Sequence, residues 1–266
     1  MKIDNFPIST NISAQACIVK GIKLYKQEDY EAAISNFEEA IRLDPNAAEA
    51  YYGRGCVNFG LKNYAEAISD YDKSIRITDN VAETYYNRAR AKGMIRDYFG
   101  ALSDLDTAIR LDPDTSSYYS IRGVTKAFLK HHDAAIQDYD EAIRLDPDDT
   151  QNYVCRAHSK TNLNLYFEAI TDCDTAIRLD PTNVDAYTWR GKTKLLLDHP
   201  EAAISDFDHA IRLGSQNAWD YANRAVAKRQ IGRADGIDAD FQKALSLAEE
   251  QGKEELKTDI LKLMQS

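Results

Sequence analysis

The six residues AIRLDP occur four times in the chain, at 40–45, 108–113, 142–147 and 176–181. Their isoleucine position recurs every 34 residues, at 41, 75, 109, 143, 177 and 211, with the weaker copies SIRITD and AIRLGS. A fixed period of this length is the signature of a repeat architecture, in which each repeat packs only against its neighbours. The period therefore predicts an array of small, similar elements rather than one globular core.

The repeats share columns of aromatic, small and apolar residues. When each repeat is numbered 1–34 from Ala14, position 4 is tyrosine in six repeats and position 8 is glycine or alanine in all of them. In the second half, Ile34, Phe37 and Ile41 have the i, i+3, i+7 spacing of an apolar helix face. Proline at position 32 of four repeats ends that helix, because the residue before a proline avoids the α region. Each repeat is therefore predicted to contain helix A, at about positions 1–14, and helix B, at about positions 15–31.

These columns resemble the tetratricopeptide repeat, whose pattern has an aromatic residue, a small residue four positions later, A-x3-F-x2-A and a closing proline. The motif style YYNRA…AK…AIRLDP is similar to that of bacterial tetratricopeptide proteins. The resemblance implies an all-α fold, a right-handed α-α superhelix (solenoid) of antiparallel helix pairs. We expect an N-terminal arm at 1–13, seven repeats at 14–251 and a C-terminal capping helix at 252–266. The expected repeats are 14–47, 48–81, 82–115, 116–149, 150–183, 184–217 and 218–251.

Repeat 7 departs from the common spacing. Ile237 lies four residues before Phe241, whereas Ile68 lies three before Tyr71. An extra residue near 238–240, offset by a shorter turn at Gly232, would explain the difference. Beyond this repeat, the spacing of apolar residues from Leu256 onward predicts an amphipathic helix that covers the open end of the array.

A charged pair of columns accompanies the apolar ones. Every repeat with arginine at position 7 has aspartate at position 23, whereas repeat 1 has Lys20 and Asn36 there. Position 7 lies beside the seam between the two helices, where an unpaired charge is costly, so we expect an ion pair within each of six repeats. The alternative is a row of arginines that binds an acidic ligand. The predicted pairs are Arg54–Asp70, Arg88–Asp104, Arg122–Asp138, Arg156–Asp172, Arg190–Asp206 and Arg224–Asp240.

Positions 2, 6, 9 and 13 of helix A fall on the side opposite positions 4, 8 and 11. The resemblance implies that this side lines a concave groove. These columns do not repeat, as expected of a surface that recognises one partner. Ile121, Val124 and Phe128 form an apolar strip there, which is typical of a site for a partner peptide or helix. The alternative is that the superhelix or the C-terminal helix buries the strip. The predicted groove residues are Tyr52, Tyr86, Asn87, Arg90, Met94, Ile121, Val124, Phe128, His158, Trp189, Lys192, Leu196 and Asn223.

Composition and charge exclude several function classes. The formal net charge is −10, which argues against non-specific nucleic-acid binding. No run approaches the ~18 apolar residues of a membrane span, so membrane insertion is not expected. The first residues lack the apolar core of a secretory signal, and the four cysteines form no CxxC. We therefore expect reduced cysteines and a cytoplasmic protein.

Catalytic and metal-binding motifs are not expected. The GKT at 191–193 lacks the first glycine of a phosphate loop, and no third ligand accompanies Cys155 and His158. No nucleophile, base and acid can be assigned, so we expect no enzyme, cofactor or metal. One branch of the tetratricopeptide repeat family binds the C-terminal carboxylates of chaperones through a set of lysine and asparagine side chains. No three successive repeats of this chain supply those side chains at the required positions.

The sequence thus predicts a non-catalytic adaptor that captures a peptide or amphipathic helix of a partner protein. Two alternatives stay open. The chain could self-assemble into homo-oligomers by stacking its terminal repeats, which a concentration-dependent mass would reveal. It could also serve as the accessory subunit of an enzyme complex.

Overall fold

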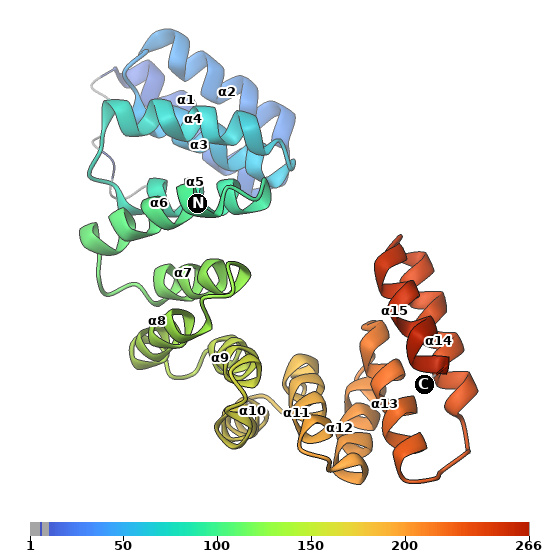
Figure 1. The fold of residues 1–266 in the computed structure, drawn as a ribbon. Helices are drawn as coiled ribbons and strands as arrows, with labels where there is room; N and C mark the ends of the chain where they lie inside the picture. Colours follow the sequence, from blue (N-terminus) through green and yellow to red (C-terminus); the bar gives the residue numbers. More distant parts are fainter. Residues whose placement is uncertain (1–5, 7–10, 266) are drawn as a thin grey trace. The chain divides into compact units, whose positions relative to one another are not determined.

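A computed structural model describes Phe6 and residues 11–265. This part of the chain folds into fifteen α-helices and no strand (Figure 1). The helices are α1 (Ile12–Lys26), α2 (Tyr30–Leu43), α3 (Ala48–Gly60), α4 (Tyr64–Ile77), α5 (Ala82–Met94), α6 (Tyr98–Leu111), α7 (Ser116–Phe128), α8 (His132–Leu145), α9 (Thr150–Asn162), α10 (Tyr166–Leu179), α11 (Val184–Leu196), α12 (Pro200–Arg212), α13 (Ala218–Gln230), α14 (Ile237–Glu250) and α15 (Glu254–Gln265).

The chain divides into two compact bodies. The N-terminal body comprises Met1–His131 and the C-terminal body comprises His132–Ser266. Within each body, an odd-numbered helix packs against the even-numbered helix that follows it, and the resulting pairs stack in chain order. The all-α solenoid of antiparallel helix pairs expected from the sequence is therefore present in both bodies.

The AIRLDP motif ends helix B. In repeat 1, α2 ends at Leu43, and Asp44 is extended at φ −141° and ψ 94° immediately before Pro45. The same geometry follows α6 and α10, where Asp112 and Asp180 are extended before a proline. The helix ends there because the proline ring clashes with an α-helical residue in front of it.

Small residues let the helices approach each other around a large residue at position 24. Phe37 is fully buried between α1, α2 and α3, and a Cβ atom on Gly53 would lie 2.5 Å from its Cε1 atom. Gly21, at position 8 of repeat 1, is similarly close to the same ring. Gly53 was assigned to a groove column from the sequence, and the structure gives it a packing role.

Substitution of Gly53 tests this close approach. We expect Gly53→Ala to lower the free energy of unfolding by about 1–3 kcal/mol, because the methyl group overpacks the buried Phe37 ring. Gly60→Ala in the same helix is the control, since a Cβ there meets no atom within 4 Å. It should leave stability unchanged or raise it by up to about 1 kcal/mol. Equal stability losses in urea unfolding of the two variants would contradict this account.

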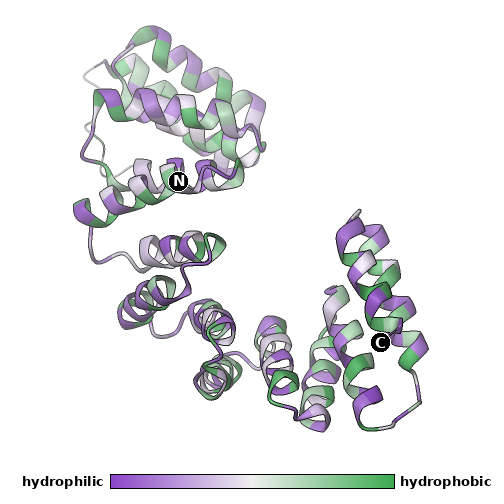
Figure 2. Cartoon of the chain, in the orientation of Figure 1, coloured by the Kyte–Doolittle hydropathy of each residue, from purple (hydrophilic) through white to green (hydrophobic). Residues whose placement is uncertain are grey.

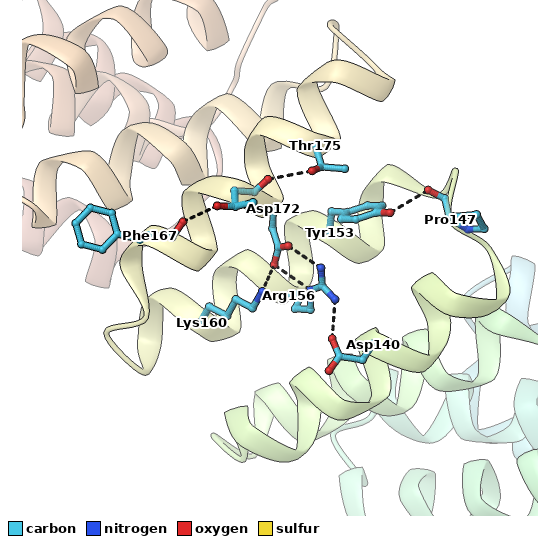
Figure 3. A network of polar contacts seen from close by, with 9 residues as sticks. Asp140, Pro147, Tyr153, Arg156, Lys160, Phe167, Asp172 and Thr175 are labelled. Carbon is cyan, nitrogen blue, oxygen red and sulfur yellow. Dashed lines mark hydrogen bonds and ion pairs between the residues drawn. The ribbon is translucent and has the colours of Figure 1, made fainter.

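The arginine at position 7 holds a network that recurs along the chain (Figure 3). In repeat 5, Arg156 Nε and Nη2 donate to the two carboxylate oxygens of Asp172 at 2.9 and 2.6 Å. Arg156 Nη1 also donates to Asp140, at position 25 of the preceding repeat, at 2.6 Å. Lys160 adds a 2.7 Å bond to Asp172, and the guanidinium lies 5.6 Å from the Tyr153 ring centre. One arginine thus joins its own two helices to each other and to the preceding repeat.

The network is repeated in both bodies. Within repeats, the structure pairs Arg54 with Asp70, Arg88 with Asp104, Arg156 with Asp172, Arg190 with Asp206, and Arg224 with Asp240. Between repeats, it pairs Arg54 with Glu38, Arg88 with Asp72, Arg122 with Asp106, Arg156 with Asp140, Arg190 with Asp174, and Arg224 with Asp208. Arg122 and Asp138 belong to different bodies, and their pair stays a prediction.

Removal of the buried carboxylate should destabilise the fold more than removal of the exposed one. The Asp172 side chain is 5% exposed and that of Asp140 is 54% exposed. We expect Asp172→Ala to cost about 3–5 kcal/mol, because it leaves two cations half-buried without their partner. Asp140→Ala should cost less than about 1 kcal/mol. Urea unfolding monitored by circular dichroism measures both, and a loss for Asp140→Ala as large as for Asp172→Ala would refute the ranking.

Repeat 7 keeps the common register, and the expected extra residue near 238–240 is wrong. Arg224 bonds Asp240 across the same 16-residue separation as the pairs of other repeats. The turn before helix B is longer, not shorter: it spans residues 231–236, with Gly236 at φ 73° directly before α14. Ile260 of α15 is fully buried against α13 and α14.

Candidate functional site

The predicted groove residues all lie on helices A, but on two bodies. Tyr52 is on α3; Tyr86, Asn87, Arg90 and Met94 are on α5; and Ile121, Val124 and Phe128 are on α7. His158 on α9, Trp189, Lys192 and Leu196 on α11, and Asn223 on α13 belong to the C-terminal body. Part of each set lines a pocket of its own body.

An open cavity of about 360 Å³ between α5 and α7, here called the N-terminal pocket, is lined by Arg90, Met94, Ile121, Val124 and Phe128 of the first set. Its apolar wall contains Met94 and Phe128, which are 55% and 66% exposed. The Phe128 ring stacks on Tyr98 with ring centres 5.6 Å apart. The complete lining is Phe59, Ala89, Arg90, Gly93, Met94, Arg96, Tyr98, Ile121, Val124, Thr125 and Phe128. The volume is within the range of ligand pockets in proteins.

Arg90 is one of the lining residues of this pocket. Its guanidinium lies 4.7 Å from the Phe59 ring centre and 5.6 Å from that of Tyr86. Nη1 donates to Asn87 Oδ1 at 3.3 Å. No carboxylate of the described residues pairs with Arg90, in contrast to Arg88 on the same helix. The two rings and the amide therefore hold a guanidinium group that has no carboxylate partner among the described residues.

Two predicted groove residues are buried and lie outside the lining of the N-terminal pocket. Tyr52 is fully buried, with the Phe6 ring centre 4.9 Å from its own. Asn87 is also buried, and its Nδ2 donates to Tyr52 Oη at 3.1 Å and to the Glu83 carbonyl at 3.0 Å. Contact of a partner with Tyr52 would require displacement of Phe6. The sequence offered no sign that a residue of the arm would pack there.

A smaller cavity of about 120 Å³ adjoins Arg90 and contains Cys56. Burial raises the pKa of the Cys56 thiol to about 11, despite the Tyr71 hydroxyl that donates to its sulfur at 3.6 Å. The thiol is therefore protonated at neutral pH. Since the thiolate is the nucleophilic form, Cys56 is poorly suited to covalent catalysis.

A cavity of about 230 Å³ in the C-terminal body, here called the C-terminal pocket, is lined by Trp189, Lys192 and Asn223 of the second set. Trp189 is its central side chain, with the His158 ring centre at 4.2 Å and Lys192 Nζ at 4.5 Å from its ring. The complete lining is Asp185, Thr188, Trp189, Lys192, Asn217, Trp219 and Asn223. Leu196 is exposed outside this lining.

The His158 ring packs against Trp189. Burial, reinforced by Lys192 and His132, lowers the pKa of His158 to about 4. The neighbouring Cys155 sulfur accepts a 3.5 Å hydrogen bond from Gln151. Among the described residues, no group of three His, Cys, Asp or Glu side chains could hold a metal ion.

The lowered pKa predicts a pH dependence. The unfolded chain binds a proton on His158 near the ordinary pKa of 6.5, whereas the folded chain does so only near 4. Stability should therefore fall as pH decreases from about 6.5 to about 4, because the unfolded state binds more protons there. His158→Phe keeps a ring against Trp189 and removes this titration. We expect the wild type to lose more stability than His158→Phe over this window in urea unfolding, and parallel pH profiles would contradict the assignment.

Hydrophilic and hydrophobic residues are interleaved along the helices (Figure 2). In the described part of the chain, no helix combines the length and apolar character needed to cross a bilayer.

The fold and its two pockets define an α-helical repeat protein with cavities lined mainly by its helices A. Three models of the tetratricopeptide repeat family match residues 18–82, 116–149 and 173–205. The chain belongs to the tetratricopeptide repeat proteins. No protein of the curated set matches its sequence.

Solved structures share the fold. A tetratricopeptide repeat protein from Parabacteroides merdae matches with a TM-score of 0.76 at 18% identity, over 94% of this chain and 99% of its own. YrrB, described as a TPR protein with an unusual peptide-binding site, matches with a TM-score of 0.61 at 21% identity, over 73% and 97%. MamA from Desulfovibrio magneticus matches with a TM-score of 0.62 at 18% identity, over 66% and 99%.

Proposed function

We propose that the protein is a non-catalytic scaffold that binds a peptide or amphipathic helix of a partner protein. The observation that carries the proposal is the N-terminal pocket. Met94 and Phe128 expose apolar surface beside Ile121 and Val124, around an open cavity of about 360 Å³. Exposed apolar clusters with a polar rim are typical of protein-interaction sites.

The surroundings of the pocket favour binding over chemistry. Its lining contains no histidine, cysteine or carboxylate that could act as nucleophile or general base. Asn87 and the rings of Phe59 and Tyr86 hold the one half-buried cation by packing and hydrogen bonding. Such an arrangement orients a bound group without reacting with it. The peptide-binding site named for YrrB supports the same kind of function here by analogy of fold.

The C-terminal pocket is a second contact region for the same partner or for another one. Trp189 and Trp219 supply large aromatic surface, and Lys192 and Asn223 supply polar groups at the rim. Tryptophan is among the residues that contribute most to protein interfaces. A cytoplasmic location is part of the proposal, since the buried thiols of Cys56 and Cys173 are free.

Selection from a displayed library of random peptides tests the proposal. The wild type and a Val124→Asp/Phe128→Asp variant are compared, with Phe99→Asp as the matched control. Phe99 is 74% exposed on α6 of the same body and lies outside the pocket lining. We expect peptides enriched on the wild type to bind Phe99→Asp equally well and to lose about tenfold or more in affinity for the double variant.

Circular dichroism establishes that all three proteins are folded. Enrichment of the same peptides with equal affinity on the wild type and the double variant would show that the N-terminal pocket is not the binding site.

A further inference from the structure

The N-terminal pocket has the opposite charge to the chain as a whole. The chain carries a net charge of −10, yet the charged residues in the pocket lining are Arg90 and Arg96, and this lining contains no aspartate or glutamate. Arg96 is exposed in the turn after α5. A pocket wall that combines apolar and cationic side chains selects for the charge of its occupant.

Arg90 is fixed in place but has unused donors. Its Nη1 bonds Asn87, whose own amide nitrogen is tied to Tyr52. Its plane is flanked by Phe59 and Tyr86. The Nε and Nη2 groups donate to no acceptor among the described residues, whereas Arg88 uses the same groups on Asp104. A guanidinium held in this way presents two parallel N–H donors, which match the two oxygens of a carboxylate.

The carboxylate that lines a cavity together with Arg90 already accepts hydrogen bonds from other residues. Glu83 lines the smaller cavity together with Arg90. One carboxylate oxygen of Glu83 accepts from Asn87 at 3.4 Å and the other from the Tyr118 hydroxyl at 3.2 Å. Glu83 and Arg90 form no ion pair, so the positive charge of Arg90 is available to a bound group.

We propose that the N-terminal pocket binds a segment of a partner protein in which an aspartate or glutamate lies next to large apolar side chains. The carboxylate pairs with Arg90, and the apolar side chains pack on Met94, Ile121, Val124 and Phe128. This inference rests on the proposed function and specifies the chemistry of the partner. It also gives a reason for the arginine at position 9 of repeat 3, which packs on two rings but forms no ion pair with a described carboxylate.

The probe is a displayed library of random peptides about a dozen residues long. Peptides selected on the wild type are sequenced, and representative ones are synthesised with a fluorescent label for affinity measurements. We expect aspartate and glutamate to be enriched beside leucine, isoleucine, methionine and phenylalanine. Affinity should decrease about tenfold or more for Arg90→Gln, and it should decrease as salt rises from about 0.05 M to about 0.5 M.

Arg110→Gln is the matched control, because Arg110 is exposed on α6 of the same body and lies outside the pocket lining. Its effect on affinity should stay within about twofold. Arg90→Glu should reverse the preference and select peptides rich in lysine and arginine. Exchange of the acidic residue of a selected peptide for its amide gives a test on the unaltered protein, and it should weaken binding as Arg90→Gln does.

The outcomes separate the two claims. Peptides that require Val124 and Phe128 but show no acidic enrichment, and that bind Arg90→Gln as tightly as the wild type, would overturn this inference and leave the proposed function standing. Peptides that bind independently of Val124 and Phe128 would overturn both. Unchanged binding after amide exchange in the peptide would also overturn the inference, whatever the stability of the Arg90 variants.

Discussion

The arginine at position 7 is the contact on which the stacked repeats depend. Arg156 pairs with Asp172 inside its own repeat, pairs with Asp140 of the preceding repeat, and packs against the Tyr153 ring. A buried carboxylate such as Asp172 is stable only with a cationic partner in place, so the aspartate column at position 23 requires the arginine column at position 7. Through the exposed carboxylate at position 25, the same arginine also fixes how successive repeats meet. This dual role explains why the charged columns at positions 7, 23 and 25 recur together.

The residues that do not repeat are left free to form binding surfaces. On α5, Arg88 belongs to the repeated network, and Arg90, two positions later, faces the N-terminal pocket without a carboxylate. The two sides of the helix have different functions. One side packs against neighbouring helices through the repeated network, and the other side lines the pocket. The same separation on α11 gives Arg190 a structural role and Trp189 a place in the C-terminal pocket.

Much of the fold could be predicted from the sequence, because each repeat uses the same local rules. The end of helix B was predictable from proline, and the pairing of columns 7 and 23 from the cost of an unpaired charge at a helix seam. Burial was less predictable where it depends on residues outside the repeat. Tyr52 is covered by Phe6 of the arm, and Gly53 faces Phe37 of the preceding repeat. The partners at position 25 were missed because they belong to the neighbouring repeat.

The site could be predicted only in part, for a related reason. Non-repeating columns identified Arg90, Met94, Ile121, Val124 and Phe128, which line one pocket. The contributions of Phe59, Arg96 and Tyr98 come from the ends of helices and a turn, where helical periodicity gives no orientation. The division into two bodies at His131 also separates the predicted groove residues into two sets, and no feature of the 34-residue period marks that division.

The most direct measurement is methyl NMR of the protein with a selected peptide bound, because it locates the occupant atom by atom. Our account predicts intermolecular nuclear Overhauser effects from the apolar side chains of the peptide to the methyl groups of Met94, Ile121 and Val124. The methyl groups of Ile12 and Val19, which are exposed on α1, should show none. Contacts to α1 alone, or to helices outside the pocket, with Met94, Ile121 and Val124 unperturbed, would contradict the central claim.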